Sequence, residues 1–467
     1  VIGENLRFAL GDFWAEFRKN RAGMVGLALV ILFLAAVILE PRIIPFPKAG
    51  ATWHDITAWD DNPPSAPPQW INRFTEKKAA ITSVVTQYEK TSEQSDSSTL
   101  VTYTFSYQDP YDVPPLDLIV HFVAAGDVPF AVSVVRPDRE EVPLYQEQRQ
   151  AGTREDVRVS MDRNSASALF DYLKGYESED TLSSVDPGQL KPVQILFSVA
   201  EPGMLKHPRP LKGMYQVKLQ GLLLSDASAL DNPYVVFTGR VSGLLGTDNS
   251  KRDLWSGLVA GVKWALLIGV LTSFIAVAVG VVYGIVEAYF GGLVNAILQR
   301  IWEVMVNMPL LPILIVLSAV FKPSIWFLIV IMSAFFWVGP VKTVYSMALQ
   351  IKEETYIEAT RALGAGHGRI IFRHMVPILV PYSFASMALS VPAAVVYEAT
   401  VSLLGLGDAS IVTWGQILHD AFSGGAVLNG LWWWVVPPGL MIAVMGMTFS
   451  FVGFAMDTIL HPKLRTR

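Results

Sequence analysis

Long uncharged apolar runs constrain the fold of this chain more than any other feature. Six runs contain no Asp, Glu, Lys or Arg: residues 22–39, 264–286, 304–321, 323–341, 375–397 and 421–456. Each is close to or longer than the roughly 18–20 helical residues that span about 30 Å of hydrocarbon. Only 16% of the residues are charged, against about a quarter in soluble domains. The pattern predicts an α-helical polytopic membrane protein with six transmembrane helices.

The first apolar run is predicted to be a retained helix and not a signal peptide. It follows a charged segment and continues into Glu40-Pro41 without a small-residue cleavage site. The chain has no cysteine, which excludes disulfides, thiolate chemistry and Cys-ligated metals.

The distribution of Lys and Arg predicts the orientation in the membrane. Basic residues gather in both tails and in the loop between the fourth and fifth runs: Arg7, Arg18, Lys19, Arg21, Lys342, Lys352, Arg361, Arg369, Arg373, Lys463, Arg465 and Arg467. The loops on the other side contain only Lys322, and residues 398–457 contain no Lys or Arg. With six crossings, this bias places both termini in the cytoplasm and a large segment between the first two helices outside it.

That segment, residues 45–250, is predicted to be a folded β-rich domain. It has 27 acidic and 18 basic residues, and it is too long for a loop and too apolar for disorder. Short runs rich in β-branched and aromatic residues, separated by turn signals, predict a sandwich-like fold: residues 99–107, 118–124, 130–135, 193–199, 214–222 and 234–241. Residues 165–176 are predicted to form a helix. The expected domains are residues 1–44, 45–250 and 251–467.

A proline-rich stretch, residues 63–68, is predicted to be a stiff connector into this domain. Trp53, Trp59 and Trp70 flank it. They suit either the membrane–water boundary or the core of the insert, and the sequence favours neither.

The polar segment at residues 355–377 lies between two apolar runs and is rich in Gly and charge. Thr355 and Glu358 have the spacing of a capping box, and Gly364 is placed to end the helix in the left-handed conformation. Tyr356, Ala359, Thr360 and Leu363 would share one face of this helix. Arg369 is expected to open the next helix, which enters the membrane near Pro377. Spacing alone is equally consistent with Glu358 as a simple cap and the arginines as orientation signals.

Several motifs resemble those of one transporter family. Residues 355–377 resemble the EAA loop of ABC importer permeases. Leu245-Gly-Thr-Asp-Asn-Ser-Lys-Arg-Asp253, Ala288-Tyr-Phe-Gly-Gly292, Glu398-Ala-Thr-Val-Ser-Leu-Leu-Gly-Leu-Gly407 with Trp414-Gly415, and His461-Pro-Lys-Leu-Arg resemble signatures of the C-type permease subunit of dipeptide, oligopeptide and nickel importers. Lys251 stands where that family usually has Gly, which puts the local turn geometry in question. The resemblance covers the first helix and nearly everything after Gly243, but not the insert.

The resemblance implies an inner-membrane permease subunit that forms half of a channel for peptides or related solutes. It implies a type I ABC importer fold, a second homologous permease, two cytoplasmic ATPases and an extracytoplasmic solute-binding protein as partners. The residues implied in ATPase coupling are Thr355, Tyr356, Glu358, Ala359, Arg361, Leu363, Gly364, His374 and Pro377. No cofactor is expected in this chain, since ATP and Mg²⁺ would bind the ATPases. Membrane lipid is an expected neighbour, and nucleic acid is not.

The remaining sequence features leave alternatives open. The sequence has no Gly-x-x-x-x-Gly-Lys-Ser/Thr, His-Glu-x-x-His or Gly-x-Ser-x-Gly motif. Glu398 and Glu303 are candidates for the translocation pathway, since ionisable groups at membrane depth are often functional; Glu303 would otherwise form an interfacial pair with Arg300. Lys263, at the outer end of the second run, is a third functional candidate, and snorkelling to the membrane surface is the alternative. The rival reading is a membrane-anchored sensor or hydrolase that uses the β-rich insert. Within the permease reading, the insert would either dock the binding protein or be a passive stabilising module.

Overall fold

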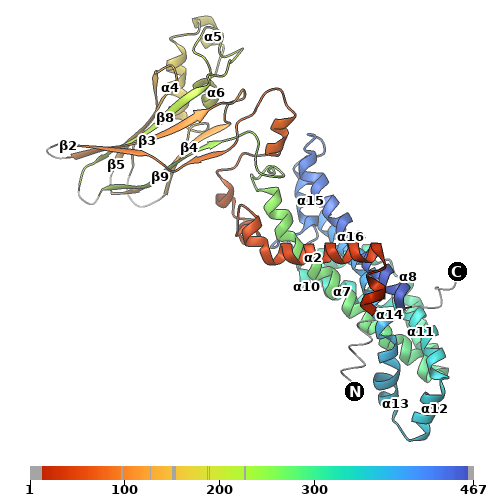
Figure 1. Cartoon of the computed structure of the whole chain (residues 1–467). Coiled ribbons are helices and arrows are strands. Elements are labelled where there is room, and N and C mark those ends of the chain that lie inside the picture. Colours follow the sequence, from red (N-terminus) through yellow and green to blue (C-terminus); the bar gives the residue numbers. More distant parts are fainter. Residues whose placement is uncertain are drawn as a thin grey trace. The chain divides into compact units, whose positions relative to one another are not determined.

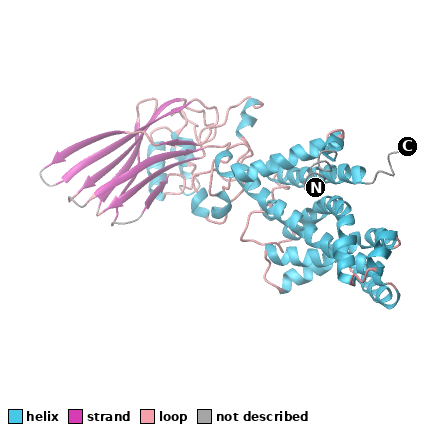
Figure 2. Ribbon diagram, turned by 60° about the horizontal axis from the view of Figure 1, so that its bottom comes forward, coloured by secondary structure: helices cyan, strands magenta, loops and turns pink. Residues whose placement is uncertain are grey.

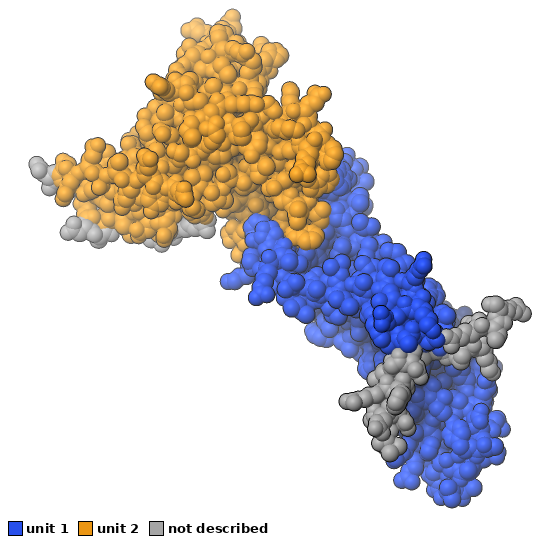
Figure 3. All heavy atoms as spheres, in the orientation of Figure 1, with its two compact units in different colours: residues 1–54, 256–467 blue, residues 55–255 orange. Residues whose placement is uncertain are grey.

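The computed structural model describes residues 13–95, 98–126, 128–149, 154–186, 188, 190–225 and 228–460. The chain forms two compact units (Figure 3): residues 1–54 with 256–467, here called the membrane unit, and residues 55–255, here called the β unit. The predictions that concern Arg7, the basic C-terminal tail and the motif at residues 461–465 lie outside the described residues.

The β unit contains two antiparallel sheets, drawn in magenta in Figure 2. The strand order is β1-β9-β4-β7 in one sheet and β2-β3-β8-β5-β6 in the other. The strands are β1 (Ser83–Val85), β2 (Glu89–Ser95), β3 (Ser98–Asp109), β4 (Asp117–Ala125), β5 (Val128–Val135), β6 (Glu141–Arg149), β7 (Arg154–Arg158), β8 (Gly213–Leu223) and β9 (Ala229–Thr238). The expected β-rich insert is confirmed.

One hydrophobic core lies between the two sheets. Burial alternates along β5 and β8, so that one side chain in two points inward. Tyr107 on β3 stacks on Phe237 on β9, with ring centroids 3.8 Å apart. Strand β4 is buried along almost its whole length. Each fully buried large apolar side chain contributes roughly 1.5–3 kcal/mol, so the unit has the core that a folded domain without disulfides needs.

Short helices accompany the sheets: α4 (Arg163–Leu173), α5 (Glu179–Ser183) and α6 (Pro192–Leu196). Helix α4 covers most of the predicted helix at residues 165–176. The strand predicted at residues 193–199 is wrong, because most of this segment is α6. Pro192 occupies the first turn of α6, where a missing amide is harmless.

The membrane unit is almost entirely helical (Figure 1). Its long elements are α2 (Arg21–Ile43), α7 (Leu254–Phe290), α8 (Gly292–Asn307), α9 (Leu310–Val320), α10 (Ile325–Phe336), α11 (Val338–Lys352), α14 (Val376–Leu403), α15 (Trp414–Ser423) and α16 (Trp432–Leu460). Short elements are α3 (Ala49–Thr52), α12 (Thr355–Ala362), α13 (His367–Ile370) and a π-helical turn at Ile371–Met375.

The described residues contain five helices that are long and apolar enough to cross a membrane, or up to six if one bent pair forms a single span. The bent pair is α8 with α9, which meet at 77°. The run at residues 304–321 is therefore not one straight helix. The break falls at Met308-Pro309, where Met308 is extended, because a residue before proline avoids the helical region.

One expectation near the membrane ends needs correction, and one open alternative is decided. Lys342 does not lie in a loop: it belongs to α11, and its Nζ lies 3.0 Å from Oε1 of the fully buried Glu287 on α7. Trp53 and Trp59 are both 1% exposed. They are core aromatics, Trp53 of the membrane unit and Trp59 of the β unit, while Trp70 is 40% exposed.

Candidate functional site

Helix α12 is the centre of the candidate site, and its start differs from the prediction. Glu354 is the N-cap residue, and no side chain caps the helix. Thr355 is the first helical residue, so the predicted capping box between Thr355 and Glu358 does not form. Glu358 is still the acidic residue of the first turn, where a negative charge interacts favourably with the helix dipole.

The end of α12 has the geometry that the sequence predicted. Gly364 has φ of 82°, in the left-handed region. Its amide donates to the carbonyl of Arg361 at 2.9 Å, and the amide of Ala365 donates to the carbonyl of Thr360 at 3.2 Å. These two bonds form a Schellman motif, which satisfies carbonyls that a helix end otherwise leaves free.

One side chain anchors α12 to the rest of the membrane unit. Ile357 is fully buried, and it belongs to a hydrophobic cluster with Val344 and Ala348 on α11 and Ile370 and Met375 on the returning segment. Figure 1 shows α12 and α13 next to each other at one end of this unit. Because an isolated eight-residue helix is unstable in water, this packing holds α12 in place.

Polar contacts connect the same region to the end of α7. The Tyr289 hydroxyl lies 2.8 Å from Nδ1 of His367, and the Arg361 guanidinium lies 5.6 Å from the centre of the Tyr289 ring. Lys352 donates to the carbonyl of Ala288 at 3.3 Å. The segment Ala288-Tyr-Phe-Gly-Gly292, at the end of α7, therefore contacts residues of α11, α12 and α13.

The opposite face of α12 is open. Leu363 is 88% exposed and Tyr356 is 39% exposed, and Ala359 between them is also exposed. Thr360, the fourth residue of the predicted face, bonds its hydroxyl to the carbonyl of Tyr356 at 2.7 Å. Together Leu363, Tyr356 and Ala359 give this short helix an exposed and largely apolar face.

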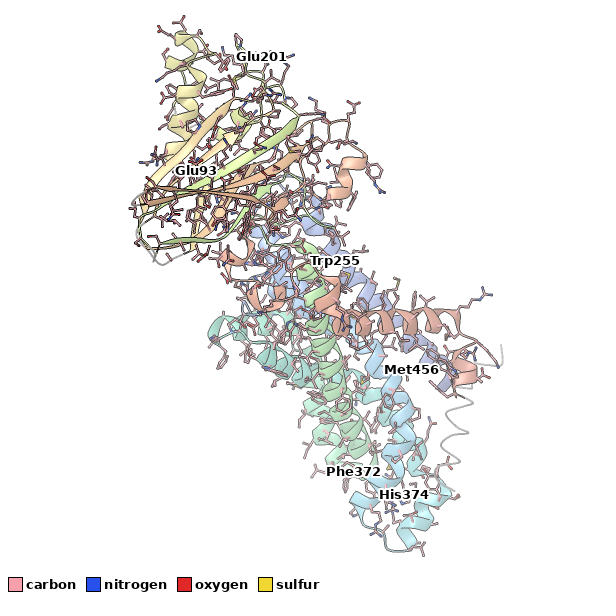
Figure 4. The ribbon with its side chains drawn as sticks, turned by 60° about the vertical axis from the view of Figure 1, so that its left-hand side comes forward. Glu93, Glu201, Trp255, Phe372, His374 and Met456 are labelled. Carbon is pink, nitrogen blue, oxygen red and sulfur yellow. The ribbon has the colours of Figure 1, made fainter. Side chains whose placement is uncertain are left out.

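After the loop, the helix begins earlier than predicted, at His367 and not at Arg369. It continues through the π-helical turn Ile371–Met375 into α14. Figure 4 labels Phe372 and His374 in this turn. His374 is half-buried, and Pro377 is exposed in the first turn of α14, where it has no amide to donate to the preceding turn. π-Helical turns often occur at functional positions.

The two carboxylates considered for the translocation pathway lie in different surroundings. Glu303 on α8 bonds to Arg300 at 2.6 Å and to Gln299 at 3.0 Å. Glu398 on α14 is 4% exposed, and it accepts a hydrogen bond from Ser402 at 2.7 Å. A pathway role for either remains a prediction. Lys263, the third candidate, lies 3.4 Å from Glu40.

The motif at residues 398–415 forms a tight connection between α14 and α15. Trp414 is buried and donates its indole N–H to the carbonyl of Leu258 at 2.9 Å. A Cβ on Gly415 would lie 2.7 Å from Cα of Ala399, so only glycine allows this approach. Asp408 accepts hydrogen bonds from Ser410 and from the amide of Ile325. Burial alone would raise its pKa, but these bonds outweigh burial and hold the pKa below its usual value.

The motif at residues 245–253 also forms a compact turn. Asp248 is fully buried, and its Oδ2 lies 2.5 Å from Nε of Arg252. Lys251 has φ of 67°, so the left-handed turn is present although Gly is not. Gly is the residue that adopts this conformation without strain, and here Lys251 adopts it.

The sequence reasoning missed three residues of the site: Ile357, Tyr289 and His367. Ile357 carried a signal, since it is the one large aliphatic residue of α12 off the predicted face. The contact between Tyr289 and His367 joins residues 78 positions apart, and no local pattern indicates it.

Comparisons with known proteins agree with this architecture. Residues 263–466 match the family described as "Binding-protein-dependent transport system inner membrane component", and residues 9–68 match "N-terminal TM domain of oligopeptide transport permease C". The two matches leave residues 69–262, which include almost the whole β unit, outside them.

Individual relatives match over about half of the chain. The dipeptide transport system permease protein DppC of Bacillus subtilis is 34% identical over 221 residues, which are 47% of this chain and 68% of the relative. The oligopeptide transport system permease protein OppC of the same organism is 31% identical, over 47% of this chain and 72% of the relative. An inward-facing structure of the MetNI methionine ABC transporter has 21% identity and a TM-score of 0.32, over 46% of this chain and 98% of that one.

The two matched regions contain most of the helical membrane unit. The dipeptide permease is 34% identical over 68% of its own length, which shows that the two proteins are related. The chain therefore belongs to the inner-membrane components of binding-protein-dependent transport systems, and it is a multi-pass membrane permease and not an enzyme.

Proposed function

We propose that this chain is one permease of an ATP-driven importer of short peptides, and that α12 couples it to an ATPase subunit. The peptide class rests on the relatives, which are named as dipeptide and oligopeptide permeases. The expected assembly contains a second homologous permease, two cytoplasmic ATPases and an extracytoplasmic solute-binding protein. The membership in a binding-protein-dependent family supports these partners.

The two faces of α12 carry the proposal for coupling. Ile357 is buried in the membrane unit, whereas Leu363 and Tyr356 point away from it. A short amphipathic helix with a free apolar face fits a groove on a partner. A displacement of α12 by the ATPase would reach α11 and α14 through the cluster around Ile357, and α7 through Tyr289.

The proposed mechanism is a shift between two arrangements of the transmembrane helices. ATP would close the ATPase pair, move α12 and turn the channel from inward-facing to outward-facing. Nucleotide shifts such an equilibrium only by its different affinity for the two states. The π-helical turn at Ile371–Met375 lies between α12 and α14, where a change in helix geometry would be absorbed.

The proposed orientation has α12 and both termini in the cytoplasm. Among the described residues, Lys352, Arg361, Arg369 and Arg373 lie in or next to the loop that contains α12, whereas the connection before α10 has only Lys322. Basic residues favour the cytoplasmic side. An external protease acting on spheroplasts should cut within residues 45–250 and spare residues 355–373, and cleavage of the α12 loop from outside would contradict the topology.

A pair of glycine variants tests the coupling. Gly364→Val forces a β-branched residue into the left-handed region, while an added Cβ there has no atom within 4 Å. The effect therefore comes from the backbone alone, at a cost of at least about 1–2 kcal/mol. Gly366→Val is the matched control, since Gly366 also has open space and its φ is −70°.

We expect Gly364→Val to lose peptide uptake and substrate-stimulated ATPase activity of the assembled transporter, with normal membrane insertion. Gly366→Val should retain both. Full uptake and ATPase stimulation in Gly364→Val would refute the coupling role of the α12 end.

A further inference from the structure

A cavity of about 280 Å³ lies within the β unit. Connector residues near Asn62, the start of β4, the end of β7, the start of α6 and the end of β9 form its walls. Cavities that hold small ligands usually measure about 300–1,000 Å³. This one is therefore suited to a small molecule or to one residue of a larger one.

The cavity has an excess of positive charge. Arg158, Lys191, Arg240 and Lys251 line it, against one carboxylate, Asp117. Two of these cations already have partners. Arg158 bonds to Asp117 at 3.3 Å, and Lys251 bonds to Asp60 at 3.0 Å.

Asp117 has no capacity left for a further cation. Its carboxylate accepts hydrogen bonds from the amide of Leu118 at 2.9 Å, from the amide of Ser160 at 3.0 Å and from the Ser160 hydroxyl at 2.6 Å, besides the bond from Arg158. A carboxylate with these four donors is a satisfied structural group. The charge of the other two cations is therefore not compensated by Asp117.

Those two cations are Arg240 and Lys191. Neither forms an ion pair with any carboxylate in the part of the chain that the structure describes. Arg240 is half-buried, and its Nε donates to the carbonyl of Pro114 at 2.9 Å, which fixes the direction of the guanidinium. Burial lowers the pKa of Arg240, because a partly desolvated cation without a counter-ion is unfavourable. A bound anion would remove this penalty.

The rest of the lining is largely apolar. Leu116, Met161, Leu190 and Val193 contribute to the walls. A bare inorganic anion would leave these side chains without contact, whereas an anion with an aliphatic group would bury apolar surface against them. Arg240 and Lys191 would bind an anionic end of the ligand, and the apolar walls would contact an aliphatic end.

We propose that this cavity binds a small carboxylate that carries an apolar substituent, with Arg240 and Lys191 as the counter-ions of its carboxylate. Arginine binds carboxylates through two parallel N–H bonds, which favours this geometry over a single point charge. The last residue of a short peptide has this chemistry. In that respect the inference rests on the proposed function, and it makes the β unit a contact for the C-terminus of the cargo.

Calorimetric titration of the purified full chain in detergent tests the proposal, with N-acetyl-leucine as probe and N-acetyl-leucinamide as its uncharged match. We expect saturable binding of the acid and at least tenfold weaker binding of the amide. Arg240→Gln and, separately, the exposed Lys191→Gln should each weaken binding of the acid at least tenfold. Arg209→Gln is the control, since Arg209 is exposed and paired with Glu201 elsewhere on the unit; it should bind like the wild type.

Three results would overturn the proposal. These are no saturable binding of the acid to the wild type, equal binding of acid and amide, or inorganic phosphate that binds as tightly as the acid. If Arg240→Gln fails to fold, Lys191→Gln decides. Because the titration needs no ATPase, its outcome is separate from transport. A chain that binds the acid but supports no peptide uptake contradicts the proposed function, and one that supports uptake without binding contradicts only this inference.

Discussion

Replacement of Ile357 by alanine should loosen α12 without unfolding the rest of the protein. Ile357 is fully buried and is the one side chain of α12 inside the hydrophobic cluster of the membrane unit. Truncation of a buried Ile to Ala costs about 2–5 kcal/mol, through lost burial and the cavity left behind. Because α12 has eight residues, it has little stability apart from this contact.

The expected magnitude follows from that free energy. If about 3 kcal/mol is lost and about 1.4 kcal/mol is a factor of ten, the open state of α12 becomes roughly 100 times more populated. Hydrogen–deuterium exchange of the amides at residues 363–365, which bond back into α12, should accelerate by that factor. The amides of β8, in the separate β unit, should not change.

Two variants sharpen the comparison. Ile357→Val removes one methylene, at about 0.5–1.5 kcal/mol, and should accelerate exchange about tenfold or less. Leu363→Ala changes a side chain that is 88% exposed, so exchange within the isolated chain should not change, while association with the ATPase should weaken. Unchanged exchange in Ile357→Ala, or an equal acceleration in Leu363→Ala, would refute the idea that Ile357 anchors the helix.

Three further predictions concern stability, each checked by thermal unfolding of the purified chain. At φ of 67°, Lys251→Gly should be about 1 kcal/mol more stable than Lys251→Ala, since both lose the side chain and only Gly is free of strain; the reverse order would contradict this. Burial raises the pKa of Asp109 to about 6, so the folded protein binds this proton more tightly than the unfolded chain does. The resulting stabilisation is worth up to about 3 kcal/mol. It is complete below about pH 4 and is lost as the pH rises through about 6. Asp109→Asn should therefore abolish a gain in stability between pH 7 and pH 5, and a gain that persists in the variant would assign it to another group. Gly415→Ala should destabilise by about 1–3 kcal/mol, whereas Gly439→Ala, where an added Cβ has open space, should be neutral; equal melting temperatures would show that the approach at Gly415 relaxes freely.

The β unit lies largely outside the regions that match known families. Its residues lie almost entirely between the two matched regions, so its role has to come from its own chemistry. Its cavity, with Arg240 and Lys191 free, gives the β unit a role in cargo contact that differs from docking the binding protein. The two roles are compatible, since the cavity takes up only part of the β unit's surface.

Several features could be read from local sequence because local physics decides them. Uncharged runs predicted the membrane helices, since a bilayer demands about 20 apolar residues in succession. Gly364 predicted the left-handed end of α12, because other residues adopt that conformation only with strain. The break between α8 and α9 could also have been predicted, because Pro309 restricts the conformation of Met308. The uncharged run at residues 304–321 predicted a single membrane helix instead.

Only the tertiary structure decided the features that depend on distant neighbours. Residues 193–199 have strand-like composition, yet most of them form α6, because Pro192 starts a helix there. Strand-like pairing is limited to the end of the segment, where Ser198 forms an isolated bridge with Pro210. Thr355 and Glu358 have the spacing of a capping box, but the helix begins after Glu354, so the hydroxyl is not at the cap. The buried anchor at Ile357, its contact with α11 and the pairing of Tyr289 with His367 join segments far apart in the chain. Burial and pairing of this kind depend on which surfaces meet after folding, and a one-dimensional pattern does not contain that information.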